Sequence, residues 1–200
     1  MKPYLVITKE IVIELIVIWV VGLVSMILLM TGTVSPFIEC FAVDDQNRLY
    51  VGTISEIQVY DKDKHIKSIS PQTSKSYMFT ISDDNTILLS TANTVYSMDL
   101  DGNILSTSDD NATDIYNQIQ YKKYKYTASN GNTYKLVSPF GFSRIVKNGS
   151  EVVYHISVFS FVIKILLYLT FLGVFFIIIS NVLKQNKKIS SRKTGDGSLS

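Results

Sequence analysis

Cysteine is almost absent from this sequence of 200 residues, since Cys40 is the only one. No intramolecular disulfide can form, so a folded domain has to be held together by its apolar core. Histidine is scarce as well: His65 and His155 lie far apart in the chain, and no nucleophile motif such as GxSxG accompanies them. The sequence therefore predicts no catalytic residue, no cofactor and no metal site.

Long apolar runs are present, and two of them bracket the chain at residues 11–30 and 158–183. Each reaches the ~20 residues that a helix needs to cross ~30 Å of hydrocarbon. The first run exceeds the ~7–15 residues of a signal-peptide core, and Pro36 follows the nearest match to a cleavage site. We expect two uncleaved transmembrane helices, over residues 11–33 and 157–183.

The charges that flank these runs predict the orientation. Residues 184–200 carry five Lys or Arg against one acid, and residues 1–10 carry Lys2 and Lys9. By the positive-inside rule both tails are cytoplasmic and residues 31–157 are extracytoplasmic. Those residues hold 11 Lys or Arg against 14 Asp or Glu, a mildly acidic balance that predicts no nucleic-acid binding. The expected location is a bacterial plasma membrane, because the richness in Ile, Lys and Asn fits an AT-rich bacterium.

Between the runs, a pattern of four short strands occurs three times, over residues 37–70, 77–106 and 123–156. Turn formers separate the strands, among them the hairpin dipeptides Asp101-Gly102 and Asn148-Gly149. The predicted strands are 37–43, 48–53, 56–61 and 65–70, then 77–81, 86–91, 94–99 and 103–106, then 123–128, 132–137, 142–147 and 151–156. The three units align on Asn47, Asn85 and Asn132, with a helical insert predicted at 108–121 in which Ile115 and Ile119 dock on the sheet.

Repeats of ~40–50 residues with four strands each resemble the blades of extracytoplasmic β-propellers. The resemblance covers residues 37–156 and rests on the pattern rather than on an exact motif. A closed propeller needs ~4–8 blades, so three units leave the ring open unless a second copy completes it. The expected fold is membrane-anchored and all-β. Two antiparallel transmembrane helices flank an antiparallel β domain (34–156) of about three four-stranded, propeller-like units that form no closed ring in one chain.

Two groups of polar residues in the domain are candidates for ligand binding. The acidic doublets Asp44-Asp45 and Asp83-Asp84 fall at corresponding turns and are the predicted ligand-facing residues. The second group alternates aromatic and basic residues, an arrangement that can bind anionic polymers or lipid head groups. An ordinary strand with Tyr on one face and Lys in solvent is the alternative for it. This basic-aromatic strip consists of Tyr121, Lys122, Lys123, Tyr124, Lys125 and Tyr126.

The two apolar runs carry small and polar residues at matched spacing. An acid at the depth of Glu14 is costly and usually has a partner. Eight and then three residues separate Glu14, Gly22 and Ser25, and the same intervals in reverse order separate Thr170, Gly173 and Asn181. Small residues let transmembrane helices approach closely. The predicted contacts are Glu14 with Asn181, Gly22 with Gly173 and Ser25 with Thr170, with Lys184 neutralising Glu14.

The short tails contain no kinase, nucleotide-binding or DNA-binding segment, and two helices alone form no transport pathway. We therefore expect a non-enzymatic protein whose extracytoplasmic domain binds a ligand or a protein, as an accessory or sensor subunit of a larger membrane complex. Its expected partners are membrane lipid and either another membrane protein or further copies of itself. Two alternatives remain open: a cell-envelope hydrolase or lyase with its site on the β domain, and a structural envelope protein that self-assembles.

Overall fold

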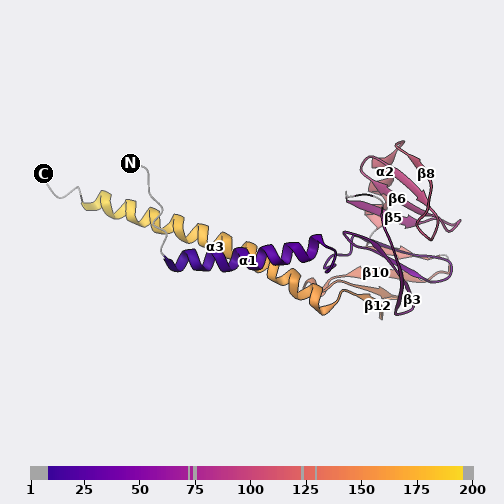
Figure 1. Ribbon diagram of the computed structural model, residues 1–200, viewed down its shortest axis with the longest axis horizontal. Helices are drawn as coiled ribbons and strands as arrows, with labels where there is room; N and C mark the ends of the chain where they lie inside the picture. Colours follow the sequence, from indigo (N-terminus) through magenta and orange to yellow (C-terminus); the bar gives the residue numbers. More distant parts are fainter. Residues whose placement is uncertain (1–8, 72, 74–75, 123, 129, 196–200) are drawn as a thin grey trace. The chain divides into compact units, whose positions relative to one another are not determined.

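The computed structural model describes residues 9–71, 73, 76–122, 124–128 and 130–195 (Figure 1). The chain divides into two compact units. Residues Met1–Thr31 and Val162–Ser200 form the helical unit, and residues Gly32–Phe161 form the β domain.

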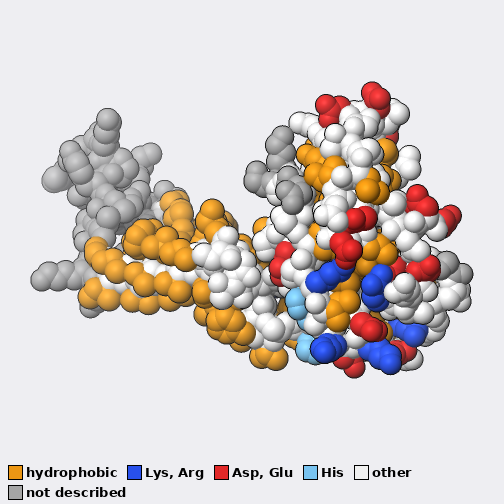
Figure 2. Space-filling view, turned by 45° about the vertical axis from the view of Figure 1, so that its right-hand side comes forward, with side chains coloured by type: hydrophobic (Ala, Val, Ile, Leu, Met, Phe, Trp, Pro, Cys, Tyr) orange, Lys and Arg blue, Asp and Glu red, His pale blue; other side chains and the backbone are white. Residues whose placement is uncertain are grey.

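The helical unit contains α1 (Lys9–Met30) and most of α3 (Val158–Gly195). The segments Val12–Met30 and Val158–Ser180 are long and apolar enough to cross a membrane. The first segment is 6% buried and the second 11%, whereas the core helix of a soluble protein would be mostly buried. Figure 2 shows the same contrast, with hydrophobic side chains covering the described helices and most charged side chains on the β domain. The helix predicted to end at residue 183 instead continues through Gly195, so most of the predicted tail is helical.

The β domain consists of three four-stranded antiparallel sheets, each built from strands that are consecutive in the chain. This confirms the three predicted four-stranded units. Sheet A contains β1 (Cys40–Val43), β2 (Leu49–Gly52), β3 (Ile57–Asp61) and β4 (Lys64–Ile69). Sheet B contains β5 (Tyr77–Ile81), β6 (Ile87–Thr91), β7 (Val95–Met98) and β8 (Ile104–Ser108). Sheet C contains β9 (Lys125–Thr127), β10 (Thr133–Val137), β11 (Arg144–Lys147) and β12 (Glu151–His155), with a short 3-10 turn at Pro139–Gly141.

The first two strands of sheet A, β1 and β2, are buried on both faces because this sheet packs against both other sheets. Every residue of β1 and β2 is buried. Neighbouring residues of a strand point to opposite faces, so Ala42 and Tyr50 enter the core shared with sheet B, while Phe41 and Val51 enter the core shared with sheet C. The first strand of sheet A contacts the first strands of both neighbours, β5 and β9. A strand buried on both faces is expected to be apolar throughout, as β1 is.

The helix α2 (Ala112–Lys122) covers sheet B over β5 and β6 (Figure 1). Its first residue accepts a hydrogen bond of 2.9 Å at the carbonyl oxygen of Ala112 from the hydroxyl of Ser90, which is fully buried. Ile119 is buried in the core shared by sheets A and B, and Ile115 packs against that core. The two isoleucines thus dock the helix as their spacing predicted.

The first hairpin of each sheet has the same backbone turn. The N–H groups of Asp44, Ser82 and Ala128 donate to the carbonyls four residues later at 3.1, 3.0 and 2.9 Å. The residue before that acceptor has positive φ in each case: 63° at Asn47, 58° at Asn85 and 82° at Gly131. Asn and Gly tolerate this conformation best. The third unit therefore aligns on Gly131, and the predicted alignment on Asn132 is wrong by one residue.

Candidate functional site

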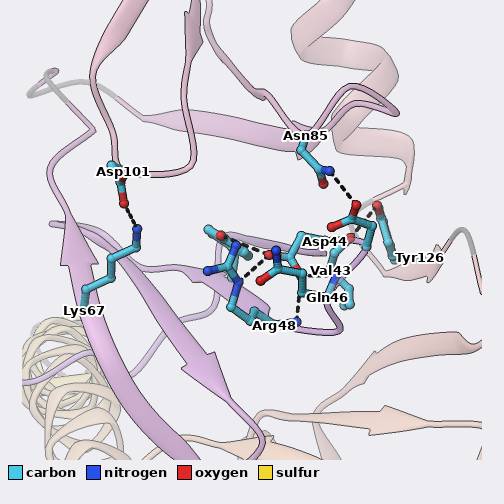
Figure 3. A network of polar contacts seen from close by, with 10 residues as sticks. Val43, Asp44, Gln46, Arg48, Lys67, Asn85, Asp101 and Tyr126 are labelled. Atoms are coloured by element: carbon cyan, nitrogen blue, oxygen red, sulfur yellow. Dashed lines mark hydrogen bonds and ion pairs between the residues drawn. The ribbon is translucent and has the colours of Figure 1, made fainter.

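The carboxylate of Asp44 lies buried inside its own turn (Figure 3). It accepts hydrogen bonds from the backbone N–H groups of Gln46 and Arg48 at 3.0 and 2.8 Å. It also accepts from the Arg48 side chain at 2.6 Å and from the Tyr50 hydroxyl at 3.3 Å. Burial, together with the negative charge of Asp44, raises the pKa of Tyr50 and keeps its phenol neutral. With four hydrogen bonds inside the domain, Asp44 stabilises the turn and presents no face to a ligand.

The corresponding turns of the three sheets lie together and form a turn cluster, defined by residues 44–48, 82–86, 128 and 130–132. The Asn85 amide donates to the Asp45 carboxylate at 2.6 Å, which joins sheets A and B (Figure 3). The Asn130 amide donates to Asn47 and joins sheets A and C. Lys67 and Asp101 form a further ion pair between sheets A and B. The predicted acidic turns therefore hold the three sheets together at one end of the domain.

The two acidic doublets do not occupy equivalent positions. Because Asn47 corresponds to Asn85, Asp44 corresponds to Ser82, and the second doublet is displaced by one residue. The Asp84 carboxylate accepts hydrogen bonds from the hydroxyls of Ser82 and Thr86, which lower its pKa. Three of the four acids, Asp44, Asp45 and Asp84, are thus engaged in the turns. Asp83 makes no side-chain hydrogen bond or ion pair with any residue that the structure describes.

Asp83 lies on a pocket of about 640 Å³ within the β domain, which we call the inner-strand pocket. It is bounded by the first strands of the three sheets (β1, β5 and β9), by α2 and by the turn that follows β5. Its lining residues are Cys40, Phe41, Phe79, Thr80, Ile81, Asp83, Leu88, Ile115, Gln118, Ile119, Lys125, Tyr126 and Thr127. One predicted acidic turn and two residues of the predicted basic-aromatic strip therefore meet at one pocket.

The polar side chains of this pocket carry one negative and one positive charge. Asp83 and Lys125 are both exposed, and neither has an ion-pair partner among the described residues. The Tyr126 hydroxyl donates to the Val43 carbonyl at 3.0 Å, and burial raises the pKa of Tyr126, with the nearby Asp83 adding to the effect. Thr80 also lines this pocket but was not predicted as a site residue. The sequence feature that could have indicated it is a polar residue within the otherwise apolar strand 77–81.

The rest of the basic-aromatic strip does not form a continuous surface. Tyr121 is in the last turn of α2 and 87% exposed, whereas Tyr124 lies between the helix and β9 and Lys125 begins that strand. Lys123 and the side chain of Lys122 lie outside what the structure describes. A helix end and a turn interrupt the strip, so the alternative of a single strand is wrong, and the binding of anionic polymers or lipid head groups stays a prediction.

A second pocket of about 610 Å³ lies where the segments flanking the helices join the β domain. We call it the linker pocket; its lining includes Ser35, Gln58, Tyr60, Tyr154, His155 and Ser160. The rings of Tyr60 and Tyr154 meet edge to face at 5.2 Å, and both hydroxyls donate to the Gln58 side-chain oxygen, at 2.9 and 3.3 Å. Burial raises the pKa of both phenols. The network already satisfies most of its polar groups internally.

The linker segments are hydrogen-bonded to each other and to the sheets. The N–H group of Ser35 donates to the Ser160 hydroxyl at 3.2 Å, and the Ser157 hydroxyl accepts from the N–H group of Ser160 at 3.0 Å, capping α3. The buried residue Ile156 donates its N–H group to the Ser143 carbonyl at 3.1 Å. Both linkers are therefore fixed to the domain.

The helices of the helical unit meet in a different register from the predicted one. A Cβ atom built on Gly22 would lie 2.8 Å from Cγ2 of Thr170, and one built on Gly173 would lie 3.0 Å from Cδ1 of Ile18. Gly22 and Gly173 both lie at the helix contact but not opposite each other, so the predicted register is wrong by about one helical turn.

The other predicted helix contacts follow from this register. Ser25 is buried, as expected of a contact residue, but Glu14 is exposed. The shift places Glu14 level with residues near Ile178 rather than with Asn181. The side chains of Asn181 and Lys184 lie outside what the structure describes, so their pairing with Glu14 stays a prediction.

A disulfide test distinguishes the two registers. The Gly22 Cβ position lies 3.8 Å from Cβ of Thr170, within the ~3.5–4.5 Å that a disulfide requires. In a Cys40→Ala background, Gly22→Cys with Thr170→Cys is expected to oxidise rapidly to a crosslinked form in membranes. The matched pair Gly22→Cys with Gly173→Cys should crosslink at least several-fold more slowly, and the opposite order would restore the register predicted from the sequence.

The chain matches no family model and no curated protein. Among solved structures it is similar to a crystal structure of a protein of unknown function from Bacteroides caccae, with 10% sequence identity and a TM-score of 0.30. The similarity covers 60% of this chain and 45% of that protein, so it spans less than half of the other chain. A similarity of this size supports no statement about function.

Proposed function

We propose that this protein is a non-enzymatic, two-pass membrane protein whose extracytoplasmic β domain binds a ligand. It acts as an accessory or sensor subunit of a larger membrane complex. In this proposal α1 and α3 are antiparallel spans with both termini in the cytoplasm, and sheets A, B and C are consecutive blades of an open, propeller-like arrangement. The lengths and low burial of the apolar helices support the membrane part of the proposal.

The observation that carries the proposal is the inner-strand pocket. Ligand pockets typically measure ~300–1,000 Å³ and combine an apolar lining with a few polar groups. This pocket has about 640 Å³, a lining of both apolar and polar side chains, and an acid and a base without partners among the described residues. Exposed charges are commonly solvated without a protein partner, so it is the position of this acid and this base at one pocket that supports a binding role.

The linkers give the β domain a means of acting on the helices. Ser35 is tied to Ser160 at the start of α3, and Ile156 is tied to Ser143 of sheet C. A rearrangement of the sheets on ligand binding would therefore move both linkers together, because these hydrogen bonds connect the linkers directly to each other and to sheet C. Trp19 supports a partner in the membrane, because it is 66% exposed in the middle of α1, away from the ends where aromatic residues usually concentrate.

Native mass spectrometry of the full-length protein, purified in mild detergent from its own membranes, tests the accessory role. We expect a second polypeptide in stoichiometric amount. Trp19→Ala should reduce the complexed fraction several-fold, whereas Phe175→Ala, which removes a similarly exposed aromatic from α3, should leave more of it intact. A lone monomer or a homodimer in the unmodified protein would overturn the accessory role.

One observation favours each alternative function. Asp63 and His155 both line the linker pocket, which is the combination an envelope hydrolase would need, although the His155 ring already contacts the Ile156 carbonyl at 2.9 Å. The edge strand β8 is exposed along its whole length and carries no charge, which suits self-assembly by strand pairing. Neither observation supplies a complete site, so the binding function has the stronger support.

A further inference from the structure

We infer that the inner-strand pocket binds a zwitterionic ligand with an apolar body, such as a free apolar α-amino acid or a short apolar peptide. In this assignment Asp83 receives the ligand's ammonium group and Lys125 its carboxylate. The inference rests on the proposed binding function of the β domain and names the class of ligand.

The floor of the pocket selects an apolar body. Phe79 and Ile81 of β5 and Phe41 of β1 contribute side chains from two different sheets, and Ile119 contributes one from α2. These four side chains are almost completely buried and form the packed base of the pocket, whereas the partly exposed Leu88, Ile115 and Tyr126 supply the apolar surface that a ligand can contact. Transfer of an apolar side chain from water to such a surface is favourable by about 25 cal/mol per Å² of apolar surface removed from water.

The charges of the pocket select both ends of the ligand. Asp83 follows β5 in sheet B, whereas Lys125 begins β9 in sheet C, so the two charges come from different sheets. A ligand with only a negative group would meet the Asp83 carboxylate, and one with only a positive group would meet the Lys125 ammonium. A zwitterion satisfies both charges, and hydrogen bonds to ionised groups are about twice as strong as neutral ones.

The neutral polar side chains of the pocket fit the same class of ligand. Thr80, Gln118 and Thr127 line the pocket and make no side-chain hydrogen bonds with other described residues. Their hydroxyl and amide groups can donate and accept, as the peptide bond of a dipeptide or the second oxygen of a carboxylate requires. The single carboxylate among the lining residues is too few for a divalent cation site.

Isothermal titration calorimetry on the full-length protein in detergent tests the inference by measuring the affinity for three defined probes: L-phenylalanine, L-leucine and the dipeptide Leu-Phe. The matched controls are N-acetyl-L-phenylalanine, which lacks the ammonium group, and L-phenylalaninamide, which lacks the carboxylate. We expect at least one zwitterion to bind and each blocked derivative of it to bind about tenfold to a hundredfold more weakly. Whichever of the amino acid and the dipeptide binds with the higher affinity indicates the size of the natural ligand.

Two variants assign the two charges. Asp83→Asn should weaken zwitterion binding at least about tenfold and abolish the discrimination against the N-acetyl derivative. Lys125→Gln should also weaken zwitterion binding at least about tenfold, and it should abolish the discrimination against the amide derivative. Asp84→Asn and Lys135→Gln are the matched controls, because Asp84 is the neighbour of Asp83 and Lys135 lies directly opposite Lys125 on β10, and neither lines the pocket. Both controls should bind normally.

The outcomes separate this inference from the proposed function. Equal binding of the zwitterion and its blocked derivatives overturns the assignment of the charges, and so does normal binding by Asp83→Asn and Lys125→Gln. If no probe binds at millimolar concentration while the full-length protein still retains its stoichiometric partner, the zwitterion class is wrong and the accessory role stands. If the protein is purified without a partner but binds the zwitterion normally, the accessory role is wrong and the zwitterion class stands.

Discussion

Replacement of Asp44 by alanine is expected to lower the free energy of unfolding of the β domain by about 3 kcal/mol. Asp44 is 2% exposed and accepts hydrogen bonds from two backbone N–H groups, from Arg48 and from Tyr50. Its removal leaves the Arg48 guanidinium, whose side chain is 21% exposed, without its carboxylate. Loss of one partner from a largely buried ion pair costs more than the pair itself contributes, because the remaining charge stays poorly solvated.

Asp99→Ala is the matched control, because Asp99 makes the same turn in the hairpin of β7 and β8. Its carboxylate accepts from the N–H groups of Asp101 and Asn103 at 2.9 and 2.8 Å, but Asp99 is only partly buried and has no arginine partner among the described residues. The decrease in the free energy of unfolding caused by Asp99→Ala should be several-fold smaller than that caused by Asp44→Ala. Urea unfolding followed by circular dichroism on the full-length protein compares the two variants. Equal losses would show that turn geometry, rather than the buried charge network, makes Asp44 important.

The strands of this domain were predictable because each is short, apolar and bounded by turn residues. The run Tyr77-Met-Phe-Thr-Ile81 is the clearest case, since its predicted and observed limits coincide. The stacking of the sheets was not predictable in this way. Both faces of β1 are buried, and a run of four apolar residues has no periodicity that says which neighbour each face meets.

The candidate site illustrates the same limit at the level of single residues. Asp83 and Lys125 lie far apart in the sequence and come together only because β5 and β9 are first strands of their sheets. The two acidic doublets look alike in the sequence, but a displacement of one residue buries Asp44 and leaves Asp83 exposed. In the helices, several small residues offer registers about one turn apart, and the spacing of Gly22 and Gly173 alone does not choose between them.

The second large effect is expected at Tyr77, which joins sheet B to sheet A. Its side chain is 1% exposed, and its hydroxyl donates to the carbonyl oxygens of Thr53 and Glu56 at 2.7 and 2.8 Å. Tyr77→Ala should lower the free energy of unfolding by about 3–5 kcal/mol, because it leaves a cavity in the core. Tyr77→Phe keeps the ring and should cost about 1–2 kcal/mol, the value of the lost hydrogen bond and of an acceptor left in a buried turn.

Tyr96→Phe provides the control for the hydroxyl, because Tyr96 packs against the same core and its hydroxyl makes no hydrogen bond with the described residues. It should leave the free energy of unfolding nearly unchanged when the variants are compared by urea unfolding. An equal loss in Tyr77→Phe and Tyr96→Phe would mean that the hydroxyl of Tyr77 does not link the sheets.

The pH dependence of the Tyr77→Phe effect gives an independent check. Burial raises the pKa of Tyr77 in the folded domain, whereas an unfolded tyrosine titrates near ~10. The neutral phenol therefore contributes its full stability below about pH 10, and this contribution is lost as the pH rises further, because the unfolded state then releases the proton first. The difference between the unmodified protein and Tyr77→Phe should be constant below about pH 9 and should shrink above about pH 10. A difference that stayed constant through this range would place the Tyr77 hydroxyl in water rather than between the two sheets.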